Sequence, residues 1–209
     1  MTALFSCAGG RLARPAPGQA LIGREDGGAL IVTPAREVWE RSELTPAELV
    51  LWSFLVAAAG RAMLDALPQL ESGCLNYWEA GNWALNDEAP PRGPKAVRAH
   101  RRVHLHLLGR SRSAADPSWR WGEAPRFPDF GARQAWTSGH ARLEPRECRA
   151  VVERTEAALL TRYGLRRDQV EPWSDCVGCA YPTPAPDSRC AECRAAEAAA
   201  PPGPDPRPR

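Results

Sequence analysis

Residues 102–110 read RVHLHLLGR, and this stretch decides the fold. Polar and apolar residues alternate along most of it, which is the period of a β-strand with one face toward a core. The apolar residues at 103, 105 and 107 then share the buried face, while Arg102, His104 and His106 share the other. Histidine is the side chain best suited to proton transfer or nucleophilic attack near neutral pH. The strand therefore predicts either a catalytic face or an ordinary basic surface.

Two helices are predicted around this strand. Thr45-Pro46-Ala47-Glu48 is a capping box with proline at the first helical position, and apolar residues follow at three- and four-residue steps. This pattern predicts a helix from about Pro46 to Leu67. A second helix is predicted from Pro145 to about Tyr163. Residues 20–23 and 29–33 flank a Gly-Gly turn and predict a β-hairpin.

An amide-rich stretch precedes the histidine strand. Residues 73–86 predict two short strands around Glu79-Ala80-Gly81, next to the histidine strand in the sheet. Amide side chains offer donors and acceptors without a charge, which suits ribose hydroxyls and phosphate oxygens, although turns and helix caps use them too. The candidate substrate-binding amides are Asn76, Asn82 and Asn86.

Two basic residues extend the list of substrate-binding candidates. Lys95, in the loop over residues 87–99, is expected to meet a phosphate, or else to be an ordinary solvated charge. Arg110 ends the histidine strand. Residues 111–130, rich in proline, glycine and aromatic side chains, predict an ordered covering loop, because so many aromatics are costly to leave in water.

The histidine strand and the elements before it resemble the histidine triad (HIT) superfamily, in which histidines alternate with apolar residues on a strand. The resemblance implies an α+β domain, an antiparallel sheet with helices, which hydrolyses or transfers nucleoside phosphates and often forms a homodimer. It places His104 at the position of the histidine that attacks the α-phosphorus. His106 then takes the position of the third histidine, which contacts phosphate, and Asn86 that of an asparagine that contacts the nucleotide.

Arg102 stands where the resemblance would place the first histidine. Arginine does not relay a proton, because its pKa exceeds about 12. Its planar fork of donors does hold phosphate well. We therefore expect Arg102 to bind substrate, and a nearby group such as His100 to orient the nucleophile.

A second motif lies near the C-terminal end. Cys176-Val177-Gly178-Cys179 is followed by ten residues and then by Cys190-Ala191-Glu192-Cys193. Two CxxC pairs supply four thiolates suited to tetrahedral zinc, in a small zinc-ribbon-like knuckle. That zinc would be structural, because four thiolates leave no open coordination position. Two disulfides or four unused cysteines are the alternatives, and a reducing compartment disfavours the first.

Composition and length set the organisation of the 209-residue chain. The first residues lack the 7–15-residue apolar run of a signal peptide, and no segment approaches the ~20 apolar residues of a membrane helix, which predicts a cytoplasmic protein. The net charge of +2 gives no global basic field for nucleic acid. We expect a loose N-terminus at 1–14, a HIT-like domain at 15–170, a zinc knuckle at 171–194 and a disordered tail at 195–209.

The sequence as a whole predicts an enzyme that cleaves a nucleoside phosphate or dinucleoside polyphosphate at the α-phosphorus, by hydrolysis or nucleotidyl transfer. A rival interpretation is a nucleotide-binding sensor without turnover, whose knuckle docks a protein partner. A third is action on 5′ adducts of nucleic acid, against which the near-zero net charge argues.

Overall fold

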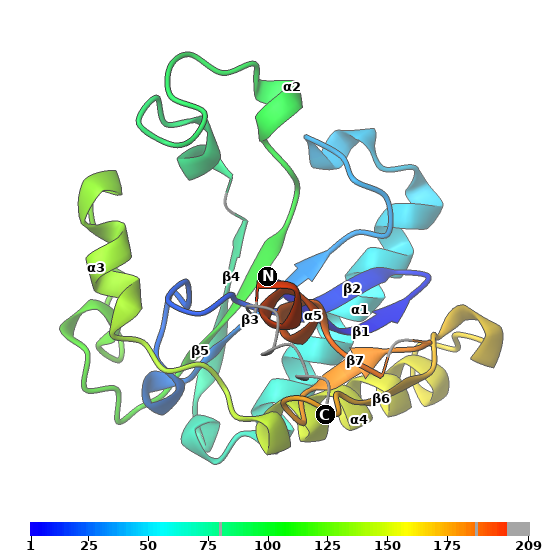
Figure 1. Cartoon of the computed structure of the whole chain (residues 1–209). Coiled ribbons are helices and arrows are strands. Elements are labelled where there is room, and N and C mark those ends of the chain that lie inside the picture. Colours follow the sequence, from blue (N-terminus) through cyan, green and yellow to red (C-terminus); the bar gives the residue numbers. More distant parts are fainter. Residues whose placement is uncertain (80, 187, 200–209) are drawn as a thin grey trace, which may run out of the picture.

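The computed structural model describes residues 1–79, 81–186 and 188–199. At its centre is a five-stranded antiparallel sheet with the strand order β1-β2-β3-β5-β4. A two-stranded sheet, β6-β7, lies in the C-terminal part (Figure 1). The strands are β1 (Thr2–Cys7), β2 (Gly10–Arg14), β3 (Ala29–Thr33), β4 (Cys74–Glu79), β5 (Leu105–Arg110), β6 (Trp173–Asp175) and β7 (Pro182–Pro184). The chain is therefore mixed α and β, as predicted.

The histidine strand is β5, which pairs with β3 on one side and β4 on the other. Leu105 and Leu107 belong to the main hydrophobic core, so the predicted core-facing side is confirmed. The other face is buried as well, so the expected half-buried strand is wrong. The strand begins only at Leu105, and the residues before it are irregular. At the other end, a Cβ on Gly109 would collide with the backbone of Gly27. A larger residue at position 109 would therefore push β5 away from the residues that precede β3.

The expected loose N-terminus is wrong. Residues 2–14 form the β1-β2 hairpin, in which Leu4, Phe5 and Leu12 are fully buried. This hairpin has no polar–apolar alternation to reveal it, because β1 is buried along nearly its whole length. It packs against α1 through β2 and against β7 and the last helix through β1. Both sides of the hairpin are therefore covered by protein.

The hairpin predicted over residues 20–33 is half wrong. Its second arm is β3, but β3 pairs with β2 and β5. In place of the first arm, the chain makes a short 3₁₀ helix, η1 (Arg24–Asp26), preceded by residues without strand structure. Leu21 and Ile22 are apolar because they are buried in a second hydrophobic cluster, which the alternation pattern alone did not reveal.

Both predicted helices are confirmed. α1 (Pro46–Ala66) begins with the capping box, in which the Glu48 N–H donates to Thr45 Oγ1 at 3.3 Å and the Thr45 N–H donates to Glu48 Oε2 at 2.8 Å. α4 (Pro145–Thr161) begins with a reciprocal cap of the same kind between Glu144 and Glu147. α1 packs against α4 and under strands β2 to β5, where the main core lies.

By length and composition, α1 is apolar enough to cross a membrane, so the expectation that no segment approaches this limit is wrong. Its buried residues, among them Trp52, Leu55 and Met63, belong to the main core. This packing is that of a core helix, and such helices commonly pass the same test of length and hydropathy.

The opposite face of the sheet is covered by the chain between β5 and α4, as the aromatic composition predicted. This covering segment contains η5 (Pro117–Trp119), η6 (Phe130–Ala132) and α3 (Arg133–Ser138). Trp119 is fully buried and joins the second hydrophobic cluster. Arg110 Nη2 donates to the carbonyl oxygens of Trp119, Arg120 and Glu123, at 3.3, 2.6 and 3.1 Å. Arg110 therefore anchors the covering segment, and we do not retain it as a substrate ligand.

The remaining short helices differ in part from the predictions. The predicted second strand after Gly81 is a 3₁₀ helix, η4 (Asn82–Leu85), and Ala80 lies outside the described residues. α2 (Val97–His100) precedes β5. The predicted disordered tail is helical in its first part, because α5 (Ala191–Ala199) continues through it, and residues 200–209 lie outside the described part. The other 3₁₀ helices are η2 (Arg41–Glu43), η3 (Pro68–Leu70) and η7 (Arg167–Gln169).

Candidate functional site

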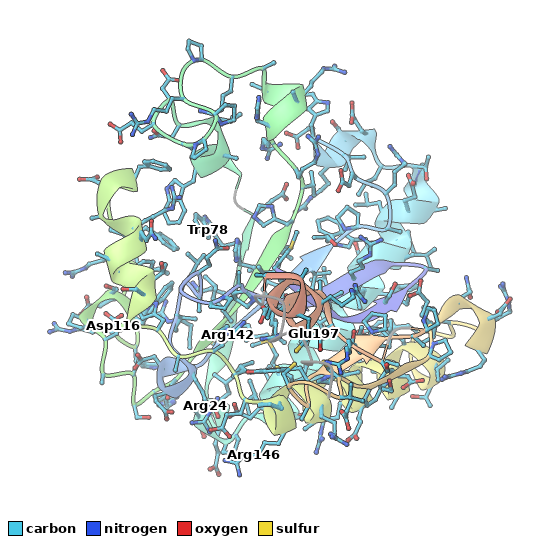
Figure 2. All side chains as sticks on the ribbon, in the orientation of Figure 1. Arg24, Trp78, Asp116, Arg142, Arg146 and Glu197 are labelled. Atoms are coloured by element: carbon cyan, nitrogen blue, oxygen red, sulfur yellow. The ribbon has the colours of Figure 1, made fainter. Side chains whose placement is uncertain are left out.

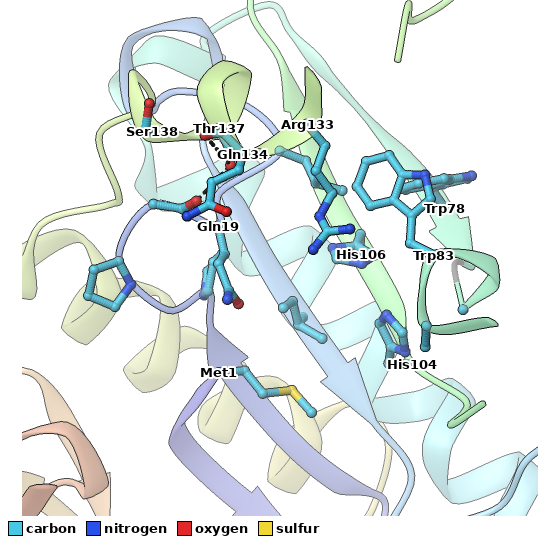
Figure 3. Close-up of a pocket in the computed structure, with 17 residues that line it drawn as sticks. Met1, Gln19, Trp78, Trp83, His104, His106, Arg133, Gln134, Thr137 and Ser138 are labelled. Atoms are coloured by element: carbon cyan, nitrogen blue, oxygen red, sulfur yellow. Dashed lines mark hydrogen bonds between the residues drawn. The ribbon is translucent and has the colours of Figure 1, made fainter. Parts of the chain in front are cut away.

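A cavity of about 460 Å³ lies on the covered face of the sheet (Figure 3). His104 and His106 line one side of it, from the histidine strand and the residue just before that strand. Trp78 of β4 and Trp83 of η4 form a second side. The rest of the wall comes mainly from α3, from the segment over residues 15–19, and from Met1, Leu21 and Ile31. The two histidines predicted to carry the chemistry thus meet in one concave site.

His104 is oriented by a backbone group. Its Nδ1 lies 2.8 Å from the carbonyl oxygen of Arg102. A carbonyl oxygen only accepts hydrogen bonds, so Nδ1 must carry the proton in this contact. In the neutral ring the lone pair then resides on Nε2. This is the tautomer that a nucleophilic histidine needs, and it does not require a side chain from His100 or Arg102.

His106 is almost fully buried, with 9% of its surface exposed. Burial first, and the neighbouring His104 second, lower the pKa of His106 to about 3. The ring is therefore neutral near pH 7. Its Nδ1 is buried and has no hydrogen-bond partner among the described residues. A buried polar atom without a partner is rare in a folded protein, so His106 sits in an unusual environment beside the cavity.

The aromatic side of the cavity is a stack of rings. The Trp78 ring lies 4.2 Å from that of Phe127 at an interplanar angle of 20°, and 6.0 Å from that of Trp83 at 76°. Trp78 is also 5.5 Å from the His106 ring. Flat aromatic faces of this kind favour a planar, polarisable ligand group such as a nucleobase.

Arg133 supplies positive charge from the opposite side. It lies at the start of α3 and lines the cavity, and its guanidinium carbon sits 4.1 Å from the centre of the Phe130 ring. Gln134 and Gln19 contribute neutral polar side chains to the same wall. Within the described part of the chain, no Asp or Glu lines the cavity. The cavity is thus suited to an anion.

The structure places the other two candidates of the histidine motif outside the cavity. Arg102 is exposed, and its donors meet Glu37 Oε2 at 3.3 Å and the carbonyl oxygens of Arg98 and Arg101 at 3.0 and 2.7 Å. His100 ends α2 and is not among the lining residues. The alternation was extended too far upstream, because the regular strand starts only at Leu105.

The amide and lysine candidates also lie away from the cavity lining. Asn86 Oδ1 accepts the Glu88 N–H at 2.9 Å, which is turn chemistry. Lys95 Nζ donates to the carbonyl oxygens of Asn86 and Gly93, at 2.5 and 3.2 Å, and so ties its own loop together. Asn82 is the exposed first residue of η4, and Asn76 is half-buried in β4 opposite Leu108.

Sequence reasoning missed the main polar and aromatic side chains of the rest of the cavity, among them Gln19, Trp78, Trp83, Arg133 and Gln134. Trp78 left a usable signal, since β4 pairs directly with the histidine strand and alternation along β4 would have placed its ring beside His106. The residues of α3 left none. That helix is six residues long, too short for a hydrophobic period.

The four predicted metal ligands do come together. The ligand atoms of Cys176, Cys179, Cys190 and Cys193 all lie within 4.8 Å of one another, and the sulfurs of Cys179 and Cys190 are 3.5 Å apart. Tetrahedral zinc–thiolate bonds of about 2.3 Å place sulfurs roughly 3.8 Å apart. The Cys190 N–H also donates to the Cys176 sulfur at 3.2 Å. This four-cysteine cluster can therefore hold a metal ion, as predicted.

The four-cysteine cluster is bound to the N-terminal hairpin by charged contacts. Arg14, which is 2% exposed, has its Nη2 3.8 Å from the Cys190 sulfur, 4.0 Å from the Cys179 sulfur and 2.9 Å from Glu192 Oε2. Its guanidinium lies 3.8 Å from the centre of the Tyr181 ring. A buried cation beside the sulfurs favours four thiolates, whose charge of −4 exceeds that of one divalent ion.

Glu192, inside the second CxxC pair, joins the four-cysteine cluster to the cavity wall. It accepts a hydrogen bond from Thr2 Oγ1 at 2.8 Å and from Arg142 Nη1 at 2.9 Å. The same Arg142 nitrogen donates to the carbonyl oxygen of Pro15, a cavity-lining residue, at 3.2 Å. Arg142 projects toward α5 in Figure 2. The C-terminal segment thus packs onto the sheet and is not a loosely attached appendage.

Comparison of the chain with protein-family models, curated proteins and solved structures gave no match. The functional argument therefore rests on the residues and geometry of the site itself.

Proposed function

We propose that this protein is a nucleotide-cleaving enzyme of the kind found in the histidine triad superfamily, with His104 as the nucleophile. The observation that carries the proposal is the hydrogen bond from His104 Nδ1 to the Arg102 carbonyl oxygen, at 2.8 Å in a cavity wall. It selects the tautomer with a free lone pair on Nε2. The arginine that replaces the first histidine of the motif is compatible with this role, because its backbone makes the contact.

The reaction would proceed in two displacements. The lone pair on His104 Nε2 forms a bond to the α-phosphorus, and the bond from phosphorus to the leaving oxygen breaks, with its electron pair staying on that oxygen. The product is a nucleotidyl-histidine. Water, or another acceptor, then attacks phosphorus from the vacated side and loses its proton to solvent. The phosphorus–nitrogen bond breaks, and its electron pair returns to Nε2.

The cavity favours a phosphate anhydride as the bond that is cleaved. An amine or alcohol leaving group needs a proton from a general acid, whereas a phosphate leaves as a stable anion. No carboxyl group lines the cavity among the described residues, and burial lowers the pKa of His106 to about 3, so this ring is a poor acid near pH 7. Nucleoside di- and triphosphates and dinucleoside polyphosphates therefore fit better than nucleoside phosphoramidates.

We propose that the metal of the four-cysteine cluster is zinc and that it is structural. Four thiolates saturate tetrahedral zinc, which leaves no position for a substrate or a water. The ion would stabilise the fold of the C-terminal segment that packs on β1 and holds Arg142 near Pro15.

A nucleotide-binding sensor without turnover is the second candidate. The observation that favours it is the position of Arg102, which takes part in ion pairing with Glu37 outside the cavity and supplies no proton relay to His104. Binding would then persist while cleavage is absent, and the two functions separate cleanly by product analysis.

The experiment is a substrate panel with chromatographic detection of nucleoside monophosphate. Diadenosine tetraphosphate, ATP, ADP and adenosine 5′-phosphoramidate are incubated with the full chain. We expect release of AMP from the anhydrides and slower release from the phosphoramidate. Binding of these nucleotides without product would establish the sensor. An enzyme that cleaves only the phosphoramidate would contradict the assignment of an anhydride leaving group.

A further inference from the structure

Arg133 is the one arginine or lysine among the described residues that line the cavity. The described residues include no ion-pair or hydrogen-bond partner for its guanidinium, whose contacts are the Phe130 ring at 4.1 Å and the Trp83 ring at 5.8 Å. A guanidinium on aromatic faces keeps its donors directed outward, because the rings contact only its flat face. The cavity thus contains a permanent cation with unused donors.

The position of Arg133 is fixed by the packing of α3. Thr137 Oγ1 donates to the carbonyl oxygen of Gly18 at 2.6 Å, which ties the helix to the segment over residues 15–19 in the same wall. On its buried side, the Trp136 ring stacks on that of Trp119 at 6.2 Å and 27°. A cation held in place before the ligand arrives loses little conformational freedom on binding.

Arg133 is directed toward the histidines. In Figure 3 its side chain extends from α3 toward His106. His106, in the wall beside His104, also has an unsatisfied buried atom, Nδ1, in a side chain with 9% of its surface exposed. The unpaired guanidinium of Arg133 thus faces the part of the cavity that His104 and His106 line. Arg102, the expected phosphate ligand, has its donors engaged elsewhere.

We propose that Arg133 is the anion-binding residue of this cavity and that it contacts the phosphoryl oxygens of the ligand placed against His104. The ligand class is a phosphate ester or anhydride, and a neutral nucleoside should bind more weakly because it has no charge to pair with the guanidinium. The identification of the bound anion as the α-phosphate of a nucleotide rests on the proposed function. The binding of an anion at Arg133 is independent of the proposed function. Where the proposed chemistry holds, Arg133 also stabilises the charge that develops on the phosphoryl oxygens.

The test measures binding of three ligands to the full chain by titration calorimetry: AMP, adenosine and inorganic pyrophosphate. Arg133→Gln removes the charge and keeps a polar side chain, and Arg133→Lys restores the charge alone. Arg112→Gln is the matched control, because Arg112 also lies over a tryptophan, Trp121 at 4.8 Å, but outside the cavity lining. Thermal unfolding of each variant verifies the fold.

We expect the wild type to bind AMP at least tenfold more tightly than adenosine. Arg133→Gln should lower the affinity for AMP and for pyrophosphate about tenfold or more, which is the effect of losing a hydrogen bond to a charged group. The affinity for adenosine should be unchanged. Arg133→Lys should recover part of the loss, and Arg112→Gln should match the wild type. Equal weakening of AMP and adenosine, or an unchanged pyrophosphate affinity, would show that Arg133 only packs the wall.

Failure of the proposed function can be distinguished from failure of the inference about Arg133. If pyrophosphate and AMP bind in an Arg133-dependent way but no nucleotide is cleaved, the anion site stands and the enzyme assignment is wrong. If the wild type binds neither anion, the inference about Arg133 is overturned even where another ligand is cleaved.

Discussion

The histidine cavity and the four-cysteine cluster differ in whether their cationic side chains are paired with a carboxylate. In the cavity, His106 Nδ1 has no partner among the described residues, and the Arg133 guanidinium contacts only aromatic rings there. At the cluster, Glu192 alone has contacts with Thr2, Arg14 and Arg142. Arg14 at the cluster also has two buried nitrogens without a partner in the described part of the chain, Nε and Nη1, so unsatisfied buried atoms alone do not separate the two regions. Charge pairing does: Glu192 pairs with Arg14 and Arg142, whereas the cavity has a cation that is unpaired among the described residues. We infer that the cavity is built for an anionic ligand and the cluster for the fold.

The largest effect is expected from breaking the four-cysteine cluster. The double substitution Cys176→Ser with Cys179→Ser should remove about one zinc per chain. Because metal binding and folding are coupled, the free energy of unfolding should fall by several kcal/mol. Elemental analysis and chemical denaturation measure the two effects. Cys74→Ser, an exposed cysteine outside the cluster, is the control. Full metal content in the double variant would show that these cysteines are not the ligands.

A smaller effect is expected from the buried histidine as the pH falls. The pKa of His106 is about 3 in the folded chain, below the ordinary 6.5, because of burial first and of His104 second. Below pH 6.5 the unfolded chain therefore binds a proton at this histidine that the folded chain does not. The contribution of the neutral His106 ring to the free energy of unfolding is therefore complete above pH 6.5 and is lost as the pH falls toward 3. His104, which faces the ring, and Arg133, which points toward it, carry no negative charge that would reverse this direction.

The measurement is chemical denaturation at pH 7.0 and pH 5.5. Between pH 7.0 and pH 5.5, the free energy of unfolding of the wild type should fall by about 1 kcal/mol more than that of His106→Gln. Loss of metal from the four-cysteine cluster on acidification affects both proteins alike and cancels in the difference. Identical losses would mean that His106 takes up a proton in the folded state, and that its ring is not sealed by the cavity walls.

The smallest effect is expected at Arg102. Its side chain is exposed and pairs with Glu37 at 3.3 Å, and exposed pairs of this kind contribute roughly 0–1 kcal/mol. Arg102→Ala keeps the carbonyl oxygen that orients His104. Nucleotide affinity and turnover should therefore stay within about twofold of the wild type. A tenfold loss in either would place the Arg102 side chain in the site, as the histidine motif alone suggested.

The two regions also differ in how much their sequence reveals. The cysteine ligands lie between residues 176 and 193, where tight turns fix their relative positions, so spacing alone identified all four. The cavity draws on residues from Met1 to Ser138. Only His104 and His106 share a readable pattern. Arg133 reaches them because Trp136 and Thr137 fix α3 over the sheet, and such tertiary contacts leave no periodicity in the sequence.

The same reasoning explains which elements of the fold were predicted. α1 and α4 carry caps and a helical period, both of which are local signals. β1 carries neither, because protein covers it on both sides and its residues do not alternate. The sequence predicted a loose segment because prolines and glycines lie close to β1, such as Gly9, Gly10, Pro15 and Pro17. The contacts that order β1 come from the C-terminal segment, far along the chain.

The central claim is that His104 is the nucleophile, and trapping the covalent intermediate tests it most directly. The full chain is mixed with an α-labelled nucleoside triphosphate and quenched in base, in which a histidine phosphoramidate survives. We predict that label appears on the protein and maps to His104 by mass spectrometry. His104→Ala should lose both label and turnover, whereas His100→Ala should retain both. Cleavage by His104→Ala at the wild-type rate, or label that persists in that variant, would contradict the account.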